Sequence, residues 1–285
     1  MIPTTFDYVR VNSIEEAVKL LKESDGEAKL LAGGHSLVPL MKFRLTTPEK
    51  LIDISKVQGL KGVRKEGNRV HIGALTTHAE VARDPIVQQY IPVLAETAKQ
   101  IGDLQVRNRG TFGGNIAHAD PAADLPATAF ALDAIVHLIG PDGEEDLPIQ
   151  DFILGPLITT LPETSVVKSI SFEIPSENSK SMYVKYAHPA SGYAVVGVCA
   201  IAEKDQEGKV TFLRIGITGA GDCAFRATSV EQHLLGKVCT AESIHEGCKL
   251  AANDGDMGND LFASSEYRKH LCSVYTERAL KEVLL

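Results

Sequence analysis

Short apolar runs dominate the first part of the chain, and their spacing changes repeatedly from helical to strand-like. Ser13-Ile14-Glu15-Glu16 has the S-x-x-E spacing of a capping box, and apolar residues at 17, 18, 20 and 21 follow at helical spacing. This pattern predicts a helix that ends near Asp25-Gly26. Further apolar runs predict strands at 28–32 and 51–54, with a short helix or turn at 37–43. We therefore expect a small α/β unit over about residues 1–55.

Short strands and short helices also alternate irregularly from about residue 56 to residue 175. Gly67-Asn68 lies between two strand-like runs and predicts a hairpin, and Thr77-His78-Ala79-Glu80 predicts a capped helix. Further elements are expected at 92–101 (helix), 102–115 (a polar segment that contains glycines), 121–132 (helix) and 134–139 (strand). Because regular strand–helix–strand alternation is missing, the pattern favours an α+β unit over a doubly wound sheet.

A different pattern begins near residue 166. Strand-like runs at 166–174, 181–186, 193–203 and 210–218 predict an antiparallel meander, and helical spacing follows at 229–235, 242–252 and 266–283. The polar stretch Pro175-Ser176-Glu177-Asn178-Ser179 has the composition of a loop. We therefore expect a domain over residues 1–175, with lobes of about 1–55 and 56–175, and a C-terminal domain over residues 176–285.

Composition narrows the class of protein. The 285 residues are 44% hydrophobic and carry a net charge of −8, which disfavours nucleic acid as the main partner. No uninterrupted apolar run is long enough for a transmembrane segment, and the N-terminus lacks the pattern of a signal peptide, so we expect a cytoplasmic protein. The five cysteines lie in the last third of the chain without C-x-x-C spacing, so no metal or iron–sulfur site is expected.

Two glycine pairs carry the strongest chemical signal. We call Ala32-Gly33-Gly34-His35-Ser36 the first glycine segment and Thr111-Phe112-Gly113-Gly114-Asn115 the second glycine segment. Glycine pairs let main-chain N–H groups approach an anion closely, and two such segments could hold a diphosphate from both sides. Neither matches a Rossmann or P-loop motif. An ordinary turn remains the alternative for either pair taken alone.

The residues around the second glycine segment leave alternatives open. Arg107 or Arg109 could offset phosphate charge, or both could form salt bridges that stabilise the loop. Asp120 is expected to cap the helix that begins near Pro121, and Asp124 to accept hydrogen bonds from ligand hydroxyls.

Four stretches of this sequence resemble one family, the FAD-binding medium subunits of molybdenum hydroxylases, and within it the carbon monoxide dehydrogenase group above all. They are Lys29 to Leu37, Arg107 to Asn115, Asp120 to Asp124, and His188 to Gly197. The similarity extends over essentially the whole chain. It implies an α+β fold, with a two-lobed FAD-binding domain of the vanillyl-alcohol-oxidase (PCMH) type and a C-terminal antiparallel sheet with helices.

The resemblance also implies which residues hold the cofactor, with the FAD diphosphate between the two glycine segments. By family position the cofactor-binding residues are Lys29, Leu30, Leu31, Ala32, Gly33, Gly34, His35, Ser36, Ile101, Thr111, Phe112, Gly113, Gly114, Asn115, Asp124, Lys185 and Tyr193. Ile101 would pack near the adenine, Asp124 would meet ribityl or ribose hydroxyls, and Lys185 would reach the flavin region. Tyr193 would lie against the isoalloxazine, with a place in the core as its alternative. The family generally binds FAD non-covalently, although His35 offers a site for covalent attachment.

The function that the resemblance implies is electron transfer within a larger oxidoreductase. A large subunit with molybdopterin and a small subunit with two [2Fe–2S] clusters would be the partners, as a dimer of heterotrimers, and FAD would pass electrons to an external acceptor. No catalytic residue is expected in this chain. Two alternatives remain: a free-standing flavin-dependent oxidase or reductase of the same superfamily, and a binding or regulatory protein without flavin.

Overall fold

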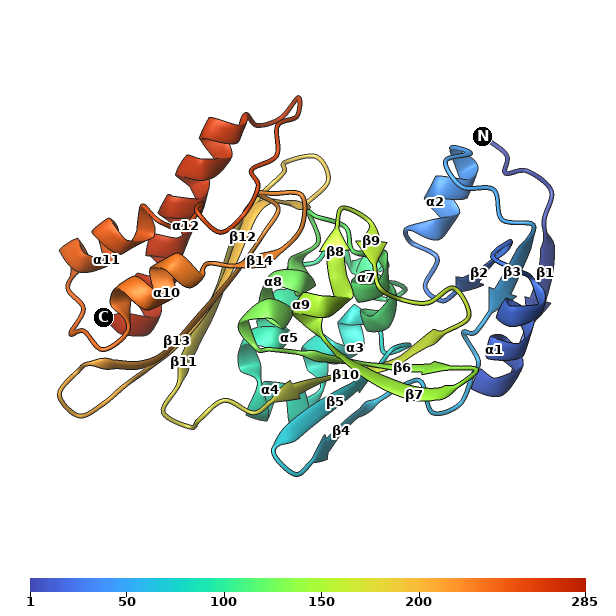
Figure 1. Cartoon of the computed structure of the whole chain (residues 1–285), viewed down its shortest axis with the longest axis horizontal. Helices are drawn as coiled ribbons and strands as arrows, with labels where there is room; N and C mark the ends of the chain where they lie inside the picture. Colours follow the sequence, from blue (N-terminus) through green and yellow to red (C-terminus); the bar gives the residue numbers. More distant parts are fainter.

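The computed structural model describes all residues, 1–285, as three parts in a row along the chain (Figure 1). The N-terminal lobe is built around a three-stranded parallel sheet in the order β1-β3-β2, in which Leu51 of β3 lies opposite both Tyr8 of β1 and Lys29 of β2. Its elements are β1 (Asp7–Arg10), α1 (Ile14–Glu23), β2 (Ala28–Leu31), α2 (Leu37–Lys42) and β3 (Lys50–Asp53).

The second lobe contains a five-stranded antiparallel sheet in the order β4-β5-β10-β6-β7. Helices cover one face, where Ile72, Ile170 and Phe172 are fully buried. Its elements are β4 (Val63–Glu66), β5 (Arg69–Gly73), α3 (His78–Arg83), α4 (Pro85–Tyr90), α5 (Pro92–Lys99), α6 (Leu104–Arg107), α7 (Phe112–His118), α8 (Asp124–Ala131), β6 (Ile135–Gly140), β7 (Gly143–Pro148), α9 (Ile149–Phe152), β8 (Ile153–Gly155), β9 (Ile158–Thr159) and β10 (Val166–Glu173).

The third part is a four-stranded antiparallel sheet with helices on both faces. Along β12, Val198 and Ala200 point into the core shared with the C-terminal helices, whereas Cys199 and Ile201 belong to the core of the second lobe. This strand is therefore buried on both faces, and it packs on α8, while its neighbour β11 packs on α5. Its elements are β11 (Lys180–Ala187), β12 (Ala194–Lys204), β13 (Val210–Thr218), β14 (Phe225–Arg226), α10 (Thr228–Leu234), α11 (Ala241–Cys248) and α12 (Ser265–Leu284).

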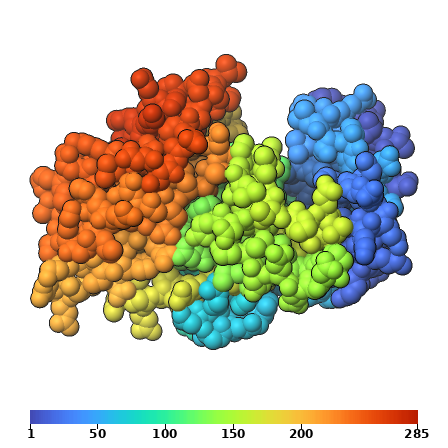
Figure 2. All heavy atoms as spheres, in the orientation of Figure 1, coloured from blue at the N-terminus to red at the C-terminus, as the bar shows by residue number.

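The expected α+β class is confirmed, and the strand and helix ranges expected from periodicity are found with shifts at their ends. The expected meander was wrong in one strand, because the strand at 166–174 (β10) lies between β5 and β6 in the sheet of the second lobe. Ser13 caps α1, and Thr77 with Glu80 forms a complete capping box on α3. Nine elements were not predicted: β1, α4, α6, α7, β7, α9, β8, β9 and β14. No helix is both long and apolar enough to cross a membrane. The N-terminal lobe and the C-terminal helices lie at opposite ends of the molecule, with the second lobe between them (Figure 2).

Candidate functional site

The first glycine segment leaves the parallel sheet at the end of β2 and leads into α2. None of the main-chain N–H groups from Ala32 to Leu37 donates a hydrogen bond to an acceptor in the protein. Gly34 has φ +75°, a left-handed conformation that glycine adopts without strain. A run of six unpartnered N–H groups in a bent chain is a binding surface for an anion, because hydrogen-bond donors left unpaired carry partial positive charge.

The two glycine segments meet, as their sequence predicted. A Cβ atom on Gly33 would lie 2.3 Å from the carbonyl oxygen of Arg109 and 3.1 Å from the Cα of Gly110. The second glycine segment is anchored in turn by a β-bridge between Thr77 and Thr111. Glycine at position 33 is therefore required by the close approach of two main chains that are far apart in sequence.

The second glycine segment is helical, whereas the sequence predicted a loop. Thr111 is the N-cap of α7, and the main chain from Phe112 to Asn115 forms the first turn of this helix. The N–H groups of Phe112 and Gly113 donate to the carbonyls of Thr76 and Ala74. Thr111 and Gly114 are the two residues of this segment whose N–H groups lack a protein acceptor. Most of the free donors thus come from the first glycine segment.

A cleft of about 1070 Å³ runs along both glycine segments, at the upper end of the range for small-molecule and cofactor sites. Fourteen of the predicted binding residues line it: Lys29, Leu30, Ala32, Gly33, Gly34, His35, Ser36, Ile101, Thr111, Gly113, Gly114, Asn115, Asp124 and Tyr193. The other three, Leu31, Phe112 and Lys185, do not line it. The ring of Phe112 is fully buried and packs edge-on against Phe172, so only its main chain faces the site.

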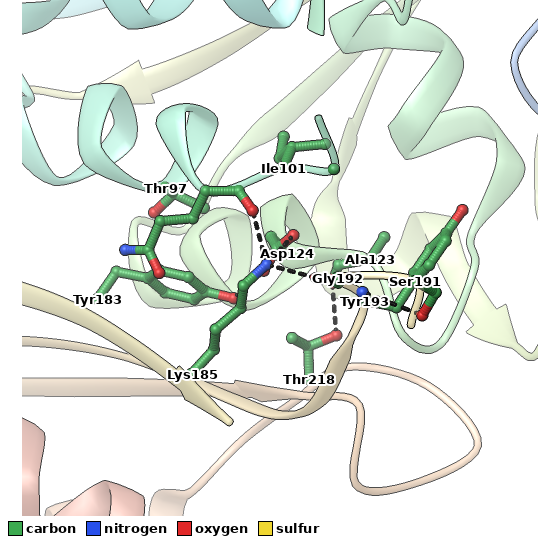
Figure 3. Close-up of polar contacts among 12 residues, drawn as sticks. Thr97, Ile101, Ala123, Asp124, Tyr183, Lys185, Ser191, Gly192, Tyr193 and Thr218 are labelled. Carbon is green, nitrogen blue, oxygen red and sulfur yellow. Dashed lines mark hydrogen bonds and ion pairs between the residues drawn. The ribbon is translucent and has the colours of Figure 1, made fainter. Parts of the chain in front are cut away.

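Asp124 lies at the first turn of α8, where its carboxylate is buried in a polar cluster (Figure 3). The hydroxyl of Tyr183 donates to Asp124 over 2.5 Å, and the ammonium nitrogen of Lys185 lies 2.9 Å from the same oxygen. Burial raises the pKa of Asp124, while Lys185 and Tyr183 lower it. The carboxylate of Asp124 thus lines the cleft and also binds two side chains of the protein, Tyr183 and Lys185. The sequence did not predict these two contacts.

The helix of Asp124 begins three residues later than expected, which corrects the role given to Asp120. Asp120 accepts a hydrogen bond from the N–H of Ala122, and Ala123 is the N-cap. The hydroxyl of Thr218 donates to the carbonyls of Pro121 and Ala123 and holds this turn against β13. Asp120 thus shapes the turn before α8 and does not cap the helix.

The two arginines near the second glycine segment have different surroundings. The guanidinium of Arg107 donates to the carbonyls of Ile101 and Gly102, both over 2.9 Å, and so stabilises the turn before α6. Arg109 is exposed, and its side chain forms no hydrogen bond or ion pair in the protein. Neither arginine lines the cleft.

Tyr193 ends a short loop between β11 and β12 and borders the cleft with 46% of its surface exposed. The loop of residues 188–193 is closed by hydrogen bonds between His188 and the main chain of Gly192 and Tyr193. The strand pattern had left open a place for Tyr193 in the core. The structure instead places this residue at the surface of the cleft.

Sequence reasoning missed two parts of the cleft. The segment 157–167 contributes several lining residues, among them Leu161 and Pro162, and no motif in it suggested a binding role. His78, the first residue of α3, also lines the cleft and is only 3% exposed. Its Nδ1 is buried without a hydrogen-bond partner, and burial lowers its pKa to about 4, so the ring is neutral at pH 7.

The residues of the cleft fit a dinucleotide cofactor. The six free N–H groups suit a diphosphate, and the buried Oδ1 of Asn115 and the Nδ1 of His78 are polar atoms without partners at the same cleft. The hydroxyl of Ser36 forms no capping hydrogen bond, so it is also free for a ligand. Donors for an anion and polar groups for a sugar or base therefore line one continuous cavity.

Comparisons with known proteins agree with this chemistry. Residues 4–176 match the family described as the FAD binding domain in molybdopterin dehydrogenase, and residues 181–283 match the CO dehydrogenase flavoprotein C-terminal domain. The chain is 39% identical to the carbon monoxide dehydrogenase medium chain of Hydrogenophaga pseudoflava, over 98% of this chain and 97% of that one. It is 34% identical to the 6-hydroxypseudooxynicotine dehydrogenase complex subunit alpha of Paenarthrobacter nicotinovorans, over 100% and 96%.

A solved structure is similar over the same length. It is carbon monoxide dehydrogenase from Hydrogenophaga pseudoflava, in a form that lacks the Mo-pyranopterin moiety of the molybdenum cofactor. One of its chains superposes on this chain with a TM-score of 0.96, and the match covers 99% of this chain and 98% of that one. Family match, relatives and fold therefore agree over the whole chain. The chain belongs to the family of FAD-binding flavoproteins of molybdopterin dehydrogenases, which are oxidoreductases, and its cofactor is FAD.

Proposed function

We propose that this chain is the FAD-carrying electron-transfer subunit of a molybdenum-dependent hydroxylase or dehydrogenase complex of the carbon monoxide dehydrogenase type. In this proposal residues 1–175 form the FAD domain and residues 176–285 the C-terminal domain. Electrons reach the flavin from [2Fe–2S] clusters in a small partner subunit, substrate is oxidised in a large molybdopterin subunit, and an external acceptor removes the electrons. The complex is a cytoplasmic dimer of heterotrimers. The five cysteines of this chain are all free, as is usual for a protein of a reducing compartment.

The observation that carries the proposal is the run of free N–H groups from Ala32 to Leu37, packed through Gly33 against Arg109 and Gly110, which directly precede the second glycine segment. FAD, when bound, supplies a group that accepts and releases electrons. The main chain of the first glycine segment holds the diphosphate, with the N–H groups of Thr111 and Gly114 on its other side. Fourteen residues that line the cleft contact the cofactor, and Tyr193 shields its mouth from water.

Copurification tests the function. A tagged copy of the chain, isolated from its own organism, is expected to carry FAD at one per chain and to bring two partner chains with it. One partner is expected to show the electron paramagnetic resonance signals of reduced [2Fe–2S] clusters. If the chain instead runs alone and oxidises or reduces a small molecule with FAD as its sole redox group, it is a free-standing flavin enzyme and the proposal is wrong.

We expect FAD to be bound non-covalently. His35 lies within the first glycine segment, where its Nδ1 is 3.3 Å from the carbonyl oxygen of Gly33, so its ring belongs to the part of the cleft that holds the diphosphate. Acid precipitation of the flavin-loaded protein is expected to leave all yellow colour in the supernatant. A yellow pellet that loses its colour in the His35→Ala variant would show a covalent bond at this residue.

A further inference from the structure

The ammonium group of Lys185 joins three segments that sequence alone does not bring together. Its nitrogen lies 2.7 Å from the carbonyl oxygen of Gln100, 2.8 Å from that of Gly192 and 2.9 Å from the carboxylate of Asp124. An ammonium group has three N–H donors, so these three acceptors use all of them. We propose that Lys185 is a positioning residue that fixes Tyr193 and Ile101 at the cofactor cleft without contacting the cofactor itself.

Burial strengthens the hydrogen bonds between Lys185 and its three acceptors. The side chain of Lys185 is 8% exposed and that of Asp124 4%, so solvent does not compete effectively for their hydrogen bonds. The hydroxyl of Tyr183, also on β11, donates to Asp124, and burial, followed by the negative charge of Asp124, raises the pKa of Tyr183 well above its ordinary value. The ion pair of Lys185 with Asp124 holds the segments around it in one geometry.

Two of the three acceptors adjoin residues of the cleft. Gln100 precedes Ile101, and Gly192 precedes Tyr193; Ile101, Gly192 and Tyr193 all line the cavity. Figure 3 shows the Lys185 side chain reaching from β11 toward Asp124 and Gly192, with Ile101 above this cluster and Tyr193 to its right. Lys185 does not line the cavity, so its effect on a bound cofactor passes through these neighbours.

The loop of residues 188–193 depends on this contact. All its other hydrogen bonds are internal, and they run between His188, Ser191 and the main chain of the loop. The bond from Lys185 to the carbonyl of Gly192 is the one hydrogen bond between the loop and the rest of the protein, and the His188 ring packs against Phe262. Loss of the ammonium group therefore frees Gly192, and Tyr193 next to it.

The inference rests on the proposed FAD function, and the test separates the two. Because Lys185→Met alone leaves a buried carboxylate without its partner and endangers folding, the informative pair is Asp124→Asn and Asp124→Asn/Lys185→Met. Both lack the buried carboxylate, and they differ in the ammonium group of Lys185 with its bonds to Gln100 and Gly192. The measurements are the affinity of the flavin-depleted native assembly for FAD, the visible circular dichroism of bound FAD, and its midpoint potential.

We expect the double variant to bind FAD about tenfold more weakly than Asp124→Asn, with a changed dichroism spectrum and a shifted midpoint potential, because two hydrogen bonds from a charged donor are lost. The control Lys204→Met removes a part-buried lysine of β12 that donates to the carbonyl of Leu284, away from the cleft, and should match the wild type. In Asp124→Asn/Lys185→Ala, added n-propylammonium should restore the affinity of Asp124→Asn.

Three outcomes would overturn the inference. Equal affinity and equal dichroism of the single and double variants would show that Lys185 does not position the cleft. A loss of the same size in Lys204→Met would show a general loss of stability. Failure of n-propylammonium to act on Asp124→Asn/Lys185→Ala would show that the ammonium group is not the cause. A wild-type assembly that takes up no FAD would instead contradict the proposed function itself.

Discussion

Gly33→Ala is expected to lower the affinity for FAD by about 100-fold, or about 3 kcal/mol. The added Cβ would lie 2.3 Å from the carbonyl oxygen of Arg109, a main-chain atom that has no side-chain freedom to move away. The first glycine segment must then shift relative to the second glycine segment. Because the anion site consists of N–H groups whose directions are set by the main chain, this shift misplaces several donors together. Titration of flavin-depleted protein with FAD measures the loss.

Gly155→Ala is the matched control for this substitution. Gly155 lies in β8, its backbone is not left-handed, and an added Cβ would meet its nearest neighbour, the end of the Ile158 side chain, at 4.0 Å. It does not line the cleft, so the variant should bind FAD like the wild type. If Gly33→Ala also binds FAD with unchanged affinity, the two glycine segments do not form the diphosphate site.

The sequence predicted well what depends on neighbouring residues. Ser13 and Thr77 cap the helices that follow them, because a cap needs only a side-chain oxygen and an N–H group three residues further on. The convergence of the glycine segments was predicted from their residue types and from the family resemblance, and the contact of Gly33 with Arg109 confirms it.

The helix α7 was missed because its glycines serve tertiary packing. Glycine is unfavourable within helices, so Gly113-Gly114 suggested a loop. In the structure a Cβ on Gly113 would lie 2.4 Å from the Cβ of Ala74, so the helix needs glycine to approach the end of β5. This contact lies between residues 39 apart by subtraction of their numbers, and no local pattern reveals it.

The same reason explains why the partners of Asp124 were missed. Tyr183 and Lys185 are 59 and 61 residues away in sequence, on a strand of another sheet. Residue types showed that Asp124 and Lys185 are candidates for the site, but their mutual distance follows only from how β11 packs on α5 and how β12 and β13 pack on α8. Sequence thus identified the residues of the site better than the contacts among them.

The pH dependence of stability is expected to reveal His78. Its pKa is lowered to about 4 in the folded protein by burial, and secondarily by the positive charges of His35 and Arg107, whereas an unfolded histidine titrates near 6.5. Below pH 6.5 the unfolded chain therefore binds a proton that the folded chain excludes. The stability from the neutral ring is fully present above pH 6.5 and is lost as the pH falls toward 4.

We expect the flavin-free wild type to lose about 2.5 kcal/mol more of its free energy of unfolding than His78→Gln between pH 7.5 and 4.5. Urea unfolding at a series of pH values measures this difference. His71, whose pKa burial also lowers, is present in both proteins and cancels in the comparison. The exposed His270→Gln serves as control and should follow the wild type. Parallel curves for His78→Gln and the wild type would mean that His78 accepts a proton in the folded protein. Its unpartnered Nδ1 would then face water, and the burial of His78 at the start of α3 would be wrong.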